Sequence, residues 1–351
     1  MSTELDLDLL DELVSVPGLS GREQQIATRI AAALPSDWHV HNDTIGNLIA
    51  SSTTSSDRKV LFLAHMDEVG LVVRRITRQG FLQVERLGGM GMRSLPGARL
   101  TLWTAAGEAL PAQVGVLPHH LDDGKSVDLA TLYVDIGATS LAEALAMGVR
   151  VGDGLTWEAP LKRLGKCFVS GKALDDRLGC FVLISLAQRL SNAKLKMGID
   201  LAFVVREEIM FNGGLPVLQK VQPQVVLGVD ATLAFDTPDL EHTQSEICLG
   251  SGPALKWFDA VRGKAAFVPD WKLAQRIREL AQQHDIPLQD EVVTGISTIV
   301  SPLPYALTGV QVAALSIPLR YHHSPIEMAH LGDVEQLVHL LFLLCIDLCG
   351  G

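Results

Sequence analysis

The sequence lacks the motifs of several common enzyme classes. It contains no G-x-x-x-x-G-K-[ST], no G-x-G-x-x-G after a strand, no H-E-x-x-H and no G-x-S-x-G. These absences argue against a P-loop, a dinucleotide-binding domain, a zinc site on a single helix and a serine nucleophile elbow. Positive charge is also scarce, since 29 lysines and arginines stand against 40 aspartates and glutamates. Because phosphate binding depends on clustered Lys and Arg, we expect no nucleic-acid partner.

Cysteines are few and show no pattern. Their odd number and wide spacing provide neither a disulfide framework nor a C-x-x-C metal site, so a reducing compartment is the simplest interpretation. Cys180 and Cys248 have no neighbouring histidine in the sequence, which disfavours a thiol nucleophile. The five cysteines are Cys167, Cys180, Cys248, Cys345 and Cys349.

Long apolar runs are absent as well. The most apolar stretch, residues 337–348, contains His339 and Asp347 and is well short of the roughly 20 residues that span a bilayer. The N-terminus, Met-Ser-Thr-Glu-Leu-Asp, is acidic where a signal peptide is basic. We therefore expect a cytoplasmic protein with no membrane partner.

The pattern of apolar residues divides the 351-residue chain into three parts. Residues 1–70 and 162–351 alternate buried strands with amphipathic helices, which is typical of an α/β domain with a mostly parallel sheet and helices on both faces. Between them, in 71–161, short Val-, Leu- and Thr-rich runs alternate with glycine and proline about every ten residues, and this predicts an inserted small β-barrel domain. Near the N-terminus, Ser20-Gly21-Arg22-Glu23 predicts a capping box at a helix start.

Five segments place histidine or carboxylate directly after an apolar run. Isolated ionisable groups are costly beside buried strands, so five recurrences need a common cause, and a pair of divalent cations would supply one. In a doubly wound sheet, ligands gather outside the carboxyl ends of the strands, where these groups are expected to meet. The segments are Ala64-His65-Met66-Asp67-Glu68, Leu174-Asp175-Asp176-Arg177, Arg206-Glu207-Glu208, Gly228-Val229-Asp230 and Tyr321-His322-His323-Ser324.

Each segment on its own permits another interpretation. Asp175-Asp176 could be ordinary acid at a helix start, where the helix dipole favours it. Glu207-Glu208 could be a surface pair, although the preceding run at 201–205 is too apolar for an exposed edge. Alternation along a strand would put His322 and His323 on opposite faces, so only one of them is expected to bind metal. His119-His120, in the β region, are expected at the surface.

Several different motifs, longer than these segments, follow one another along nearly the whole chain. They include residues 46–50, 64–70, 133–138, 171–177 and 320–328. Together they resemble the tetrahedral aminopeptidases of the forty-second metallopeptidase family, which includes bacterial glutamyl aminopeptidase. The resemblance implies two divalent metal ions per subunit, zinc or cobalt in the first place and manganese as an alternative. His65, Asp175 and Asp230 would hold one ion, and Asp175, Glu208 and His323 would hold the other, with Asp175 bridging.

The resemblance also implies the chemistry. Glu207 would be the general base that takes a proton from the attacking water and delivers it to the departing amine, and Asp67 would orient His65. The activity would be release of N-terminal residues from short peptides. The inserted β domain would mediate dimerisation within a homo-oligomer, a tetrahedral dodecamer built from dimers.

Two alternatives remain open at the level of sequence. One is a related metallo-deacylase or carboxypeptidase-like amidohydrolase that uses the same metals, and the other is a catalytically idle metal-binding scaffold, which the intact Glu207 disfavours. The chain also departs from the family pattern in two places. Met210 and Asn212 stand where glycine and arginine are usual, and Thr294-Gly295-Ile296-Ser297-Thr298 stands where Gly-Gly-Thr-Asp-Ala is usual. Both departures concern the preferred substrate and the level of activity.

Overall fold

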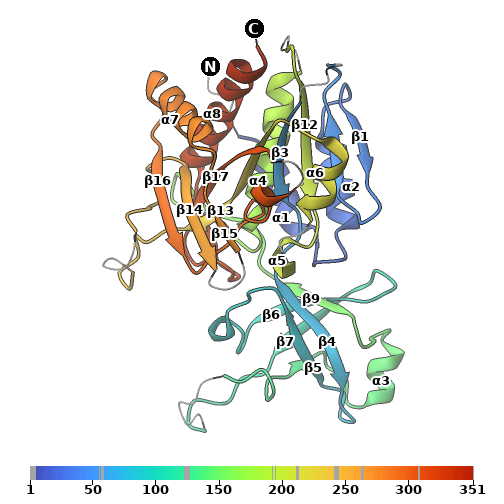
Figure 1. Ribbon diagram of the computed structural model, residues 1–351. Coiled ribbons are helices and arrows are strands. Elements are labelled where there is room, and N and C mark those ends of the chain that lie inside the picture. Colours follow the sequence, from blue (N-terminus) through green and yellow to red (C-terminus); the bar gives the residue numbers. More distant parts are fainter. Residues whose placement is uncertain are drawn as a thin grey trace.

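A computed structural model describes residues 5–54, 56, 59–121, 127–191, 193, 195–210, 213–240, 245–261, 265–306 and 309–350. The chain forms an α/β body from which a β-barrel projects at one end (Figure 1). The C-terminal end of the last helix lies at the end of the body away from the barrel (Figure 1). Among the described residues, none of the helices has the length and apolar character needed to cross a membrane.

A nine-stranded sheet forms the centre of the body, and its four central strands are parallel to one another. These strands are almost entirely buried, which explains their continuous apolar sequences. In spatial order they are β12 (Gly198–Val204), β3 (Lys59–His65), β13 (Val225–Leu233) and β17 (Gln311–Leu319). The predicted mostly parallel α/β sheet is therefore confirmed.

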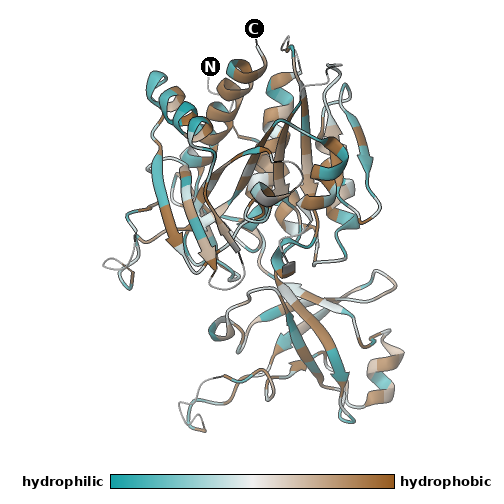
Figure 2. Ribbon diagram, in the orientation of Figure 1, coloured by the Kyte–Doolittle hydropathy of each residue, from teal (hydrophilic) through white to brown (hydrophobic). Residues whose placement is uncertain are grey.

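The outer strands of the sheet were not all foreseen. On one side β2 and β1 add antiparallel pairs, and on the other β14 pairs antiparallel with β17 and β15 and parallel with β16. Figure 2 shows hydrophobic colour concentrated in the central strands and more hydrophilic colour in the outer ones. The outer strands are β1 (His39–Asn42), β2 (Leu48–Ser51), β14 (Ala254–Val261), β15 (Ala265–Phe267) and β16 (Gln289–Thr294).

Helices cover both faces of the sheet, as predicted. Along β3, Phe62 and Ala64 point into the larger core cluster, whereas Leu61 and Leu63 point into a second one, because successive side chains alternate in direction. The helix α6 (Gly214–Val221) and the 3-10 turn η2 (Leu303–Tyr305) pack on the second face. The first face is covered by α1 (Leu7–Ser15), α2 (Gln24–Ala33), α4 (Leu174–Leu190), α7 (Trp271–Gln283) and α8 (Leu331–Cys349).

The predicted β-barrel is confirmed as a closed barrel in the order β4-β5-β8-β7-β6-β9. It has a core of its own, which includes Leu71, Val84, Leu102 and Trp157. Its strands are β4 (Gly70–Ile76), β5 (Leu82–Leu87), β6 (Arg99–Trp103), β7 (Ala109–Val114), β8 (Val134–Asp135) and β9 (Gly154–Trp157), accompanied by η1 (Met92–Ser94) and α3 (Leu141–Ala146).

Two short features bring distant segments to the junction between body and barrel. A three-stranded antiparallel sheet joins β10 (Lys162–Leu164), β11 (Phe168–Gly171) and β18 (Glu327–His330), with Gly171 opposite Glu327. The one-turn helix α5 (Glu207–Met210) follows β12. Both features lie at the carboxyl end of the central strands, where the candidate residues are found.

The predicted capping box is wrong. Helix α2 begins at Gln24, and its N-cap residue Glu23 makes no side-chain capping bond. The hydroxyl of Ser20 donates instead to Oδ2 of Asp67 at 2.6 Å. A charged acceptor from a distant segment competes successfully with the local backbone, because a hydrogen bond to a carboxylate is stronger than one to a neutral group.

Candidate active site

The histidines and carboxylates of the five segments converge at the carboxyl edge of the sheet, as predicted. His65 is the last residue of β3, and Asp230 lies in β13. Asp175 lies in the first turn of α4, and Glu207 and Glu208 begin α5 directly after β12. His65, Asp175 and Asp230 are almost completely buried.

One group of ligand atoms surrounds the imidazole of His65. Its Nε2 lies 2.9 Å from Oδ1 of Asp175, 3.7 Å from Oδ1 of Asp230 and 4.0 Å from Oε2 of Glu207. The three ligand atoms of His65, Asp175 and Asp230 all lie within 4.8 Å of one another. Imidazole nitrogen and carboxylate oxygen at such separations can share one divalent cation.

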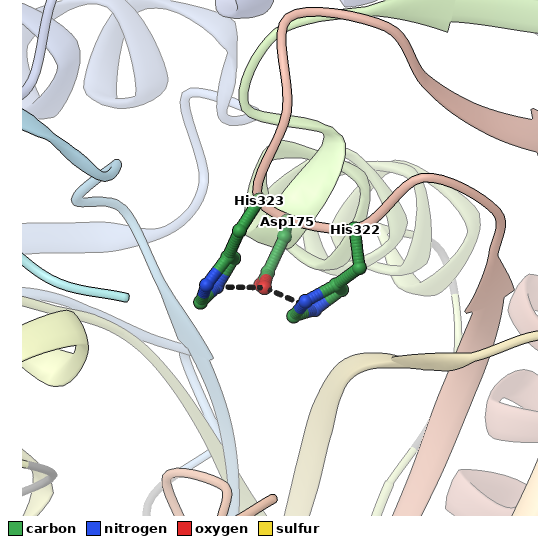
Figure 3. A group of neighbouring side chains, drawn as sticks. All are labelled: Asp175, His322 and His323. Atoms are coloured by element: carbon green, nitrogen blue, oxygen red, sulfur yellow. Dashed lines mark ion pairs between the residues drawn. The ribbon is translucent and has the colours of Figure 1, made fainter. Parts of the chain in front are cut away.

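A second group gathers at the other oxygen of Asp175. Figure 3 shows the rings of His322 and His323 approaching the Asp175 carboxylate from two sides. Oδ2 of Asp175 lies 2.7 Å from Nε2 of His322 and 3.2 Å from Nε2 of His323. Oε1 of Glu208 also lies 3.2 Å from Nε2 of His323. These three residues, Asp175, His322 and His323, form the second candidate group for a metal ion.

The expectation that His322 and His323 lie on opposite faces of a strand is wrong. Strand β17 ends at Leu319, and the chain turns at 321–324, with a φ of +56° at His323. The two rings stack at a centroid separation of 4.2 Å and an interplanar angle of 23°. Because the pair lies in a turn, both imidazoles reach Asp175, and that of His323 also lies near Glu208.

Asp67 links the His65 segment to α5. Nδ1 of His65 lies 3.2 Å from the backbone oxygen of Asp67 and 3.5 Å from its Oδ1. The Asp67 carboxylate also accepts from the backbone N–H groups of Glu207 at 3.0 Å and Glu208 at 3.2 Å. Asp67 thus faces His65, as expected, and in addition holds the start of α5, a contact that the sequence did not reveal.

Glu327 is a site residue that sequence reasoning missed. Its carboxylate is buried and accepts from the backbone N–H of Asp175 at 3.1 Å and from that of His323 at 2.7 Å. One side chain therefore fixes the backbone of two candidate ligands from segments far apart in the sequence. The available signal was its place in the motif at 320–328, where an acid follows the two histidines.

The electrostatics of the site call for positive charge. Burial, together with the charge of Asp175, raises the pKa of Asp230 to about 7 and that of Glu327 to about 8. Burial also raises the pKa of Glu207. Burial opposes the ionisation of Asp175 too, yet the neighbouring imidazoles of His322, His323 and His65 hold the pKa of Asp175 well below its usual range.

The donor set fits divalent cations. Oε1 of Glu207 is buried and finds no hydrogen-bond partner among the residues that the structure describes. Such a group is costly in a protein interior unless a cation or a bound molecule satisfies it. Zinc and related metals accept both imidazole nitrogen and carboxylate oxygen. The candidate residues therefore match divalent metal ions in both chemistry and spacing.

Both departures from the family pattern include residues close to this site. Met210 is the last residue of α5, and Asn212 lies outside the described residues. The segment 294–298 follows β16 into a loop, and the next residue, Ile299, donates its backbone N–H to Oδ2 of Asp230 at 3.1 Å. The second departure is therefore followed directly by a residue that hydrogen-bonds the candidate ligand Asp230.

Known proteins resemble this chain in both sequence and fold. Residues 46–340 match the family described as M42 glutamyl aminopeptidase. The aminopeptidase-named protein SgcX of Escherichia coli is 34% identical over 343 residues, which cover 95% of this chain and 91% of SgcX. The structure of aminopeptidase APDkam598 of Desulfurococcus kamchatkensis superposes with a TM-score of 0.91 at 31% identity, covering 96% of this chain and 93% of that one.

A further solved structure is the TET1 peptidase of Pyrococcus horikoshii, which can assemble into a tetrahedron or a large octahedral shell. It superposes with a TM-score of 0.87 at 30% identity and covers 97% of this chain and 98% of that one. The resemblance predicted from the ordered motifs is confirmed, and with it a peptidase of the hydrolase class. The chain belongs to the M42 glutamyl aminopeptidase family.

Proposed function

We propose that this protein is a two-metal aminopeptidase that removes N-terminal residues from short peptides. The observation that carries the proposal is the position of Asp175. Its Oδ1 faces His65 at 2.9 Å, whereas its Oδ2 faces His323 at 3.2 Å. A carboxylate whose two oxygens face two separate ligand groups is suited to bridge two cations.

The ligands of each cation follow from these distances. His65 and Asp230 would join Asp175 at one position, and Glu208 and His323 would join it at the other. We prefer His323 to His322 because Nε2 of His323 lies 3.2 Å from Oε1 of Glu208. When bound, the cations supply Lewis acidity to the scissile carbonyl and to the attacking water. Zinc or cobalt suits this donor set, with manganese as an alternative.

Glu207 is the proposed general base. It is buried, and its Oε2 lies near His65 while Oε1 has no partner among the described residues. A carboxylate in that position can accept a proton from water and then deliver it to the departing amine. Asp67 holds Glu207 by accepting its backbone N–H and also lies against the ring of His65. Asp67 would therefore position the base and a ligand together.

We further propose that the barrel is an inserted dimerisation domain, residues 71–161, between catalytic segments 1–70 and 162–351. The proposed assembly is a tetrahedral dodecamer, by analogy with the assembly of TET1 peptidase. Active sites that face an inner chamber would admit short, unfolded peptides. The free thiols, including the exposed Cys167, suit a reducing cytoplasm.

Hydrolysis assays test the proposed activity. The protein is loaded with Zn²⁺ or Co²⁺ and assayed on aminoacyl-nitroanilides, on short peptides and on the same substrates after N-acetylation. Turnover of substrates with a free amine and little turnover of acetylated ones is expected. Preference for acetylated amino acids would instead indicate a deacylase, and no turnover of any substrate would favour an idle scaffold.

A further inference from the structure

Three charged side chains are completely buried in the outer part of the sheet, near the active site. They are Lys256 and Asp259 on β14 and Glu291 on β16. Nζ of Lys256 donates to Oε1 of Glu291 at 2.6 Å and lies 3.8 Å from Oδ2 of Asp259. Removing such charges from water costs several kcal/mol per ion, so a buried cluster of this kind suggests a role other than stability.

The cluster holds the loop that follows β16. Asp259 accepts from the hydroxyl of Thr298 at 3.0 Å and from that of Ser301 at 3.0 Å. The hydroxyl oxygen of Ser301 in turn accepts from the backbone N–H of Thr298 at 3.0 Å. Thr298 and Ser301 are themselves buried. The loop is therefore tied at two points to one ionisable side chain.

Ile299 lies between these two anchors and contacts Asp230. Its backbone N–H donates to Oδ2 of Asp230, which leaves Oδ1 of Asp230 on the side of His65, 3.7 Å from Nε2 of that ring. The cluster also reaches the same strand directly, because the hydroxyl of Thr232 donates to Glu291. Thr232 follows Asp230 by two residues and so lies on the same face of β13.

We propose that Thr298 and Ser301 are positioning residues that set the Asp230 carboxylate through the backbone N–H of Ile299. The buried Lys256, Asp259 and Glu291 anchor them, and Thr232 fixes the strand beside Asp230. This inference rests on the proposed function in treating Asp230 as a metal ligand. Thr298 belongs to the segment that departs from the family pattern, and an alanine there would have no hydroxyl to donate. The unusual sequence at 294–298 therefore affects the position of a proposed metal ligand, in addition to any effect on substrate preference.

Titration of the metal-free protein with Co²⁺ tests this role. Absorbance and calorimetry give the two dissociation constants, and Asp230→Asn and Glu208→Gln identify which constant belongs to which position. Thr298→Val keeps the shape of the side chain but removes the hydroxyl. We expect it to weaken the cation at Asp230 by about tenfold, the lower end of the effect of losing a residue that supports a ligand. The cation at Glu208 should bind as in the wild type.

Two further variants serve as controls. Thr298→Ser restores a hydroxyl and should recover the affinity of the Asp230 position. Ser297→Ala removes a neighbouring hydroxyl whose buried oxygen has no hydrogen-bond partner among the described residues, so both dissociation constants should be unchanged. Unchanged Co²⁺ affinity in Thr298→Val would overturn the inference. Equal weakening at both positions, with a matching fall in thermal midpoint, would also overturn it by assigning Thr298 a purely structural role.

The wild-type titration separates this inference from the proposed function. If the wild-type protein binds no Co²⁺, the metal site itself is refuted, and the positioning role is refuted with it. If the wild type binds two ions and only the variants behave differently from expectation, the proposed function stands and the positioning role alone is lost.

Discussion

Glu207 is the single residue on which the proposed chemistry depends most directly. Asp67 fixes the backbone of Glu207 by accepting its N–H. The Glu207 carboxylate lies near His65, a proposed ligand of one cation, but is not itself one of the proposed ligands. Glu207→Gln keeps the size of the side chain but cannot accept a proton. We expect kcat to fall by about 10²–10⁴-fold, the usual contribution of a general base. Metal content, measured by elemental analysis of the same sample, should remain at the wild-type value, and undiminished turnover would show that another group is the base.

Glu23 provides a test of electrostatics at residue scale. Burial and the nearby charge of Asp67 raise its pKa to about 7 from the usual 4.5 of a glutamate. Its Oε1 accepts from the backbone N–H groups of Gly21 and Arg206, a role that the oxygen of glutamine can also fill. In the folded state the proton is held more tightly than in the unfolded state, so stability present below pH ~4.5 is lost as the pH rises to ~7.

Glu23→Gln should remove this loss. Relative to the wild type, we expect the variant to gain stability progressively between pH 4.5 and 7 and to keep the gain at pH 8, by at most about 3 kcal/mol. Urea unfolding of the metal-free protein at pH 4, 6 and 8 measures the difference. The pH 4 comparison is an internal control, because the carboxyl is largely protonated in both states there. An equal difference at all three values would contradict the predicted titration.

The residues of the site differ in how well the sequence could reveal them. His65, Asp175 and Asp230 carry ligand chemistry directly at the end of apolar runs, so their convergence follows from the geometry of a parallel sheet. The position of His322 could not be predicted, because alternation assumes a strand where the chain in fact turns. Glu327 was missed because its contact with Asp175 depends on the pairing of β18 with β11, which no local pattern encodes.

At the scale of elements, a close contact joins the body to the first strand of the barrel. A Cβ added at Gly70 would lie 2.2 Å from a methyl group of Leu19 and 2.5 Å from the backbone oxygen of Leu155 in β9. The oxygen belongs to a paired strand and cannot move aside easily. Gly70→Ala should therefore destabilise the protein by about 1–3 kcal/mol, as overpacking usually does.

Thermal and urea unfolding measure the effect of Gly70→Ala. Gly91→Ala is the matched control, because it adds the same methyl group beside the barrel where the nearest atom is at 3.6 Å and φ is -71°. The control should unfold close to the wild type. If Gly70→Ala is as stable as the control, the contact between Leu19, β4 and β9 is looser than the structure indicates.

The elements themselves were predictable where burial is complete and less so elsewhere. The central strands β3, β12, β13 and β17 read as continuous apolar runs because both of their faces are covered by helices. Strand β14 was not predicted, because it carries the buried charges Lys256 and Asp259 within its sequence. In the sequence, such charges are typical of an exposed segment. Their burial is explained only by their partners on β16 and in the loop that follows it.

At the scale of the whole molecule, the barrel exposes large apolar side chains that a single chain leaves uncovered. Val116, Leu117 and Leu121, in the segment after β7, are 61%, 62% and 64% exposed. Exposed apolar groups gathered on one segment are typical of protein interfaces. We propose that a second copy of this chain covers these apolar side chains, so a symmetric contact through the barrel is expected.

Light scattering coupled to size exclusion tests this assembly. The wild-type protein is expected at twelve times the subunit mass of 37.9 kDa. Leu117→Asp places a charge that would be desolvated in the contact, so it should release smaller species while the circular dichroism spectrum of the subunit stays the same. Gln79→Asp, which adds a charge at an exposed polar position of the barrel, should leave the mass unchanged. A wild-type mass of 37.9 kDa would contradict the assembly, and an unchanged mass for Leu117→Asp would place the interface on another surface of the molecule.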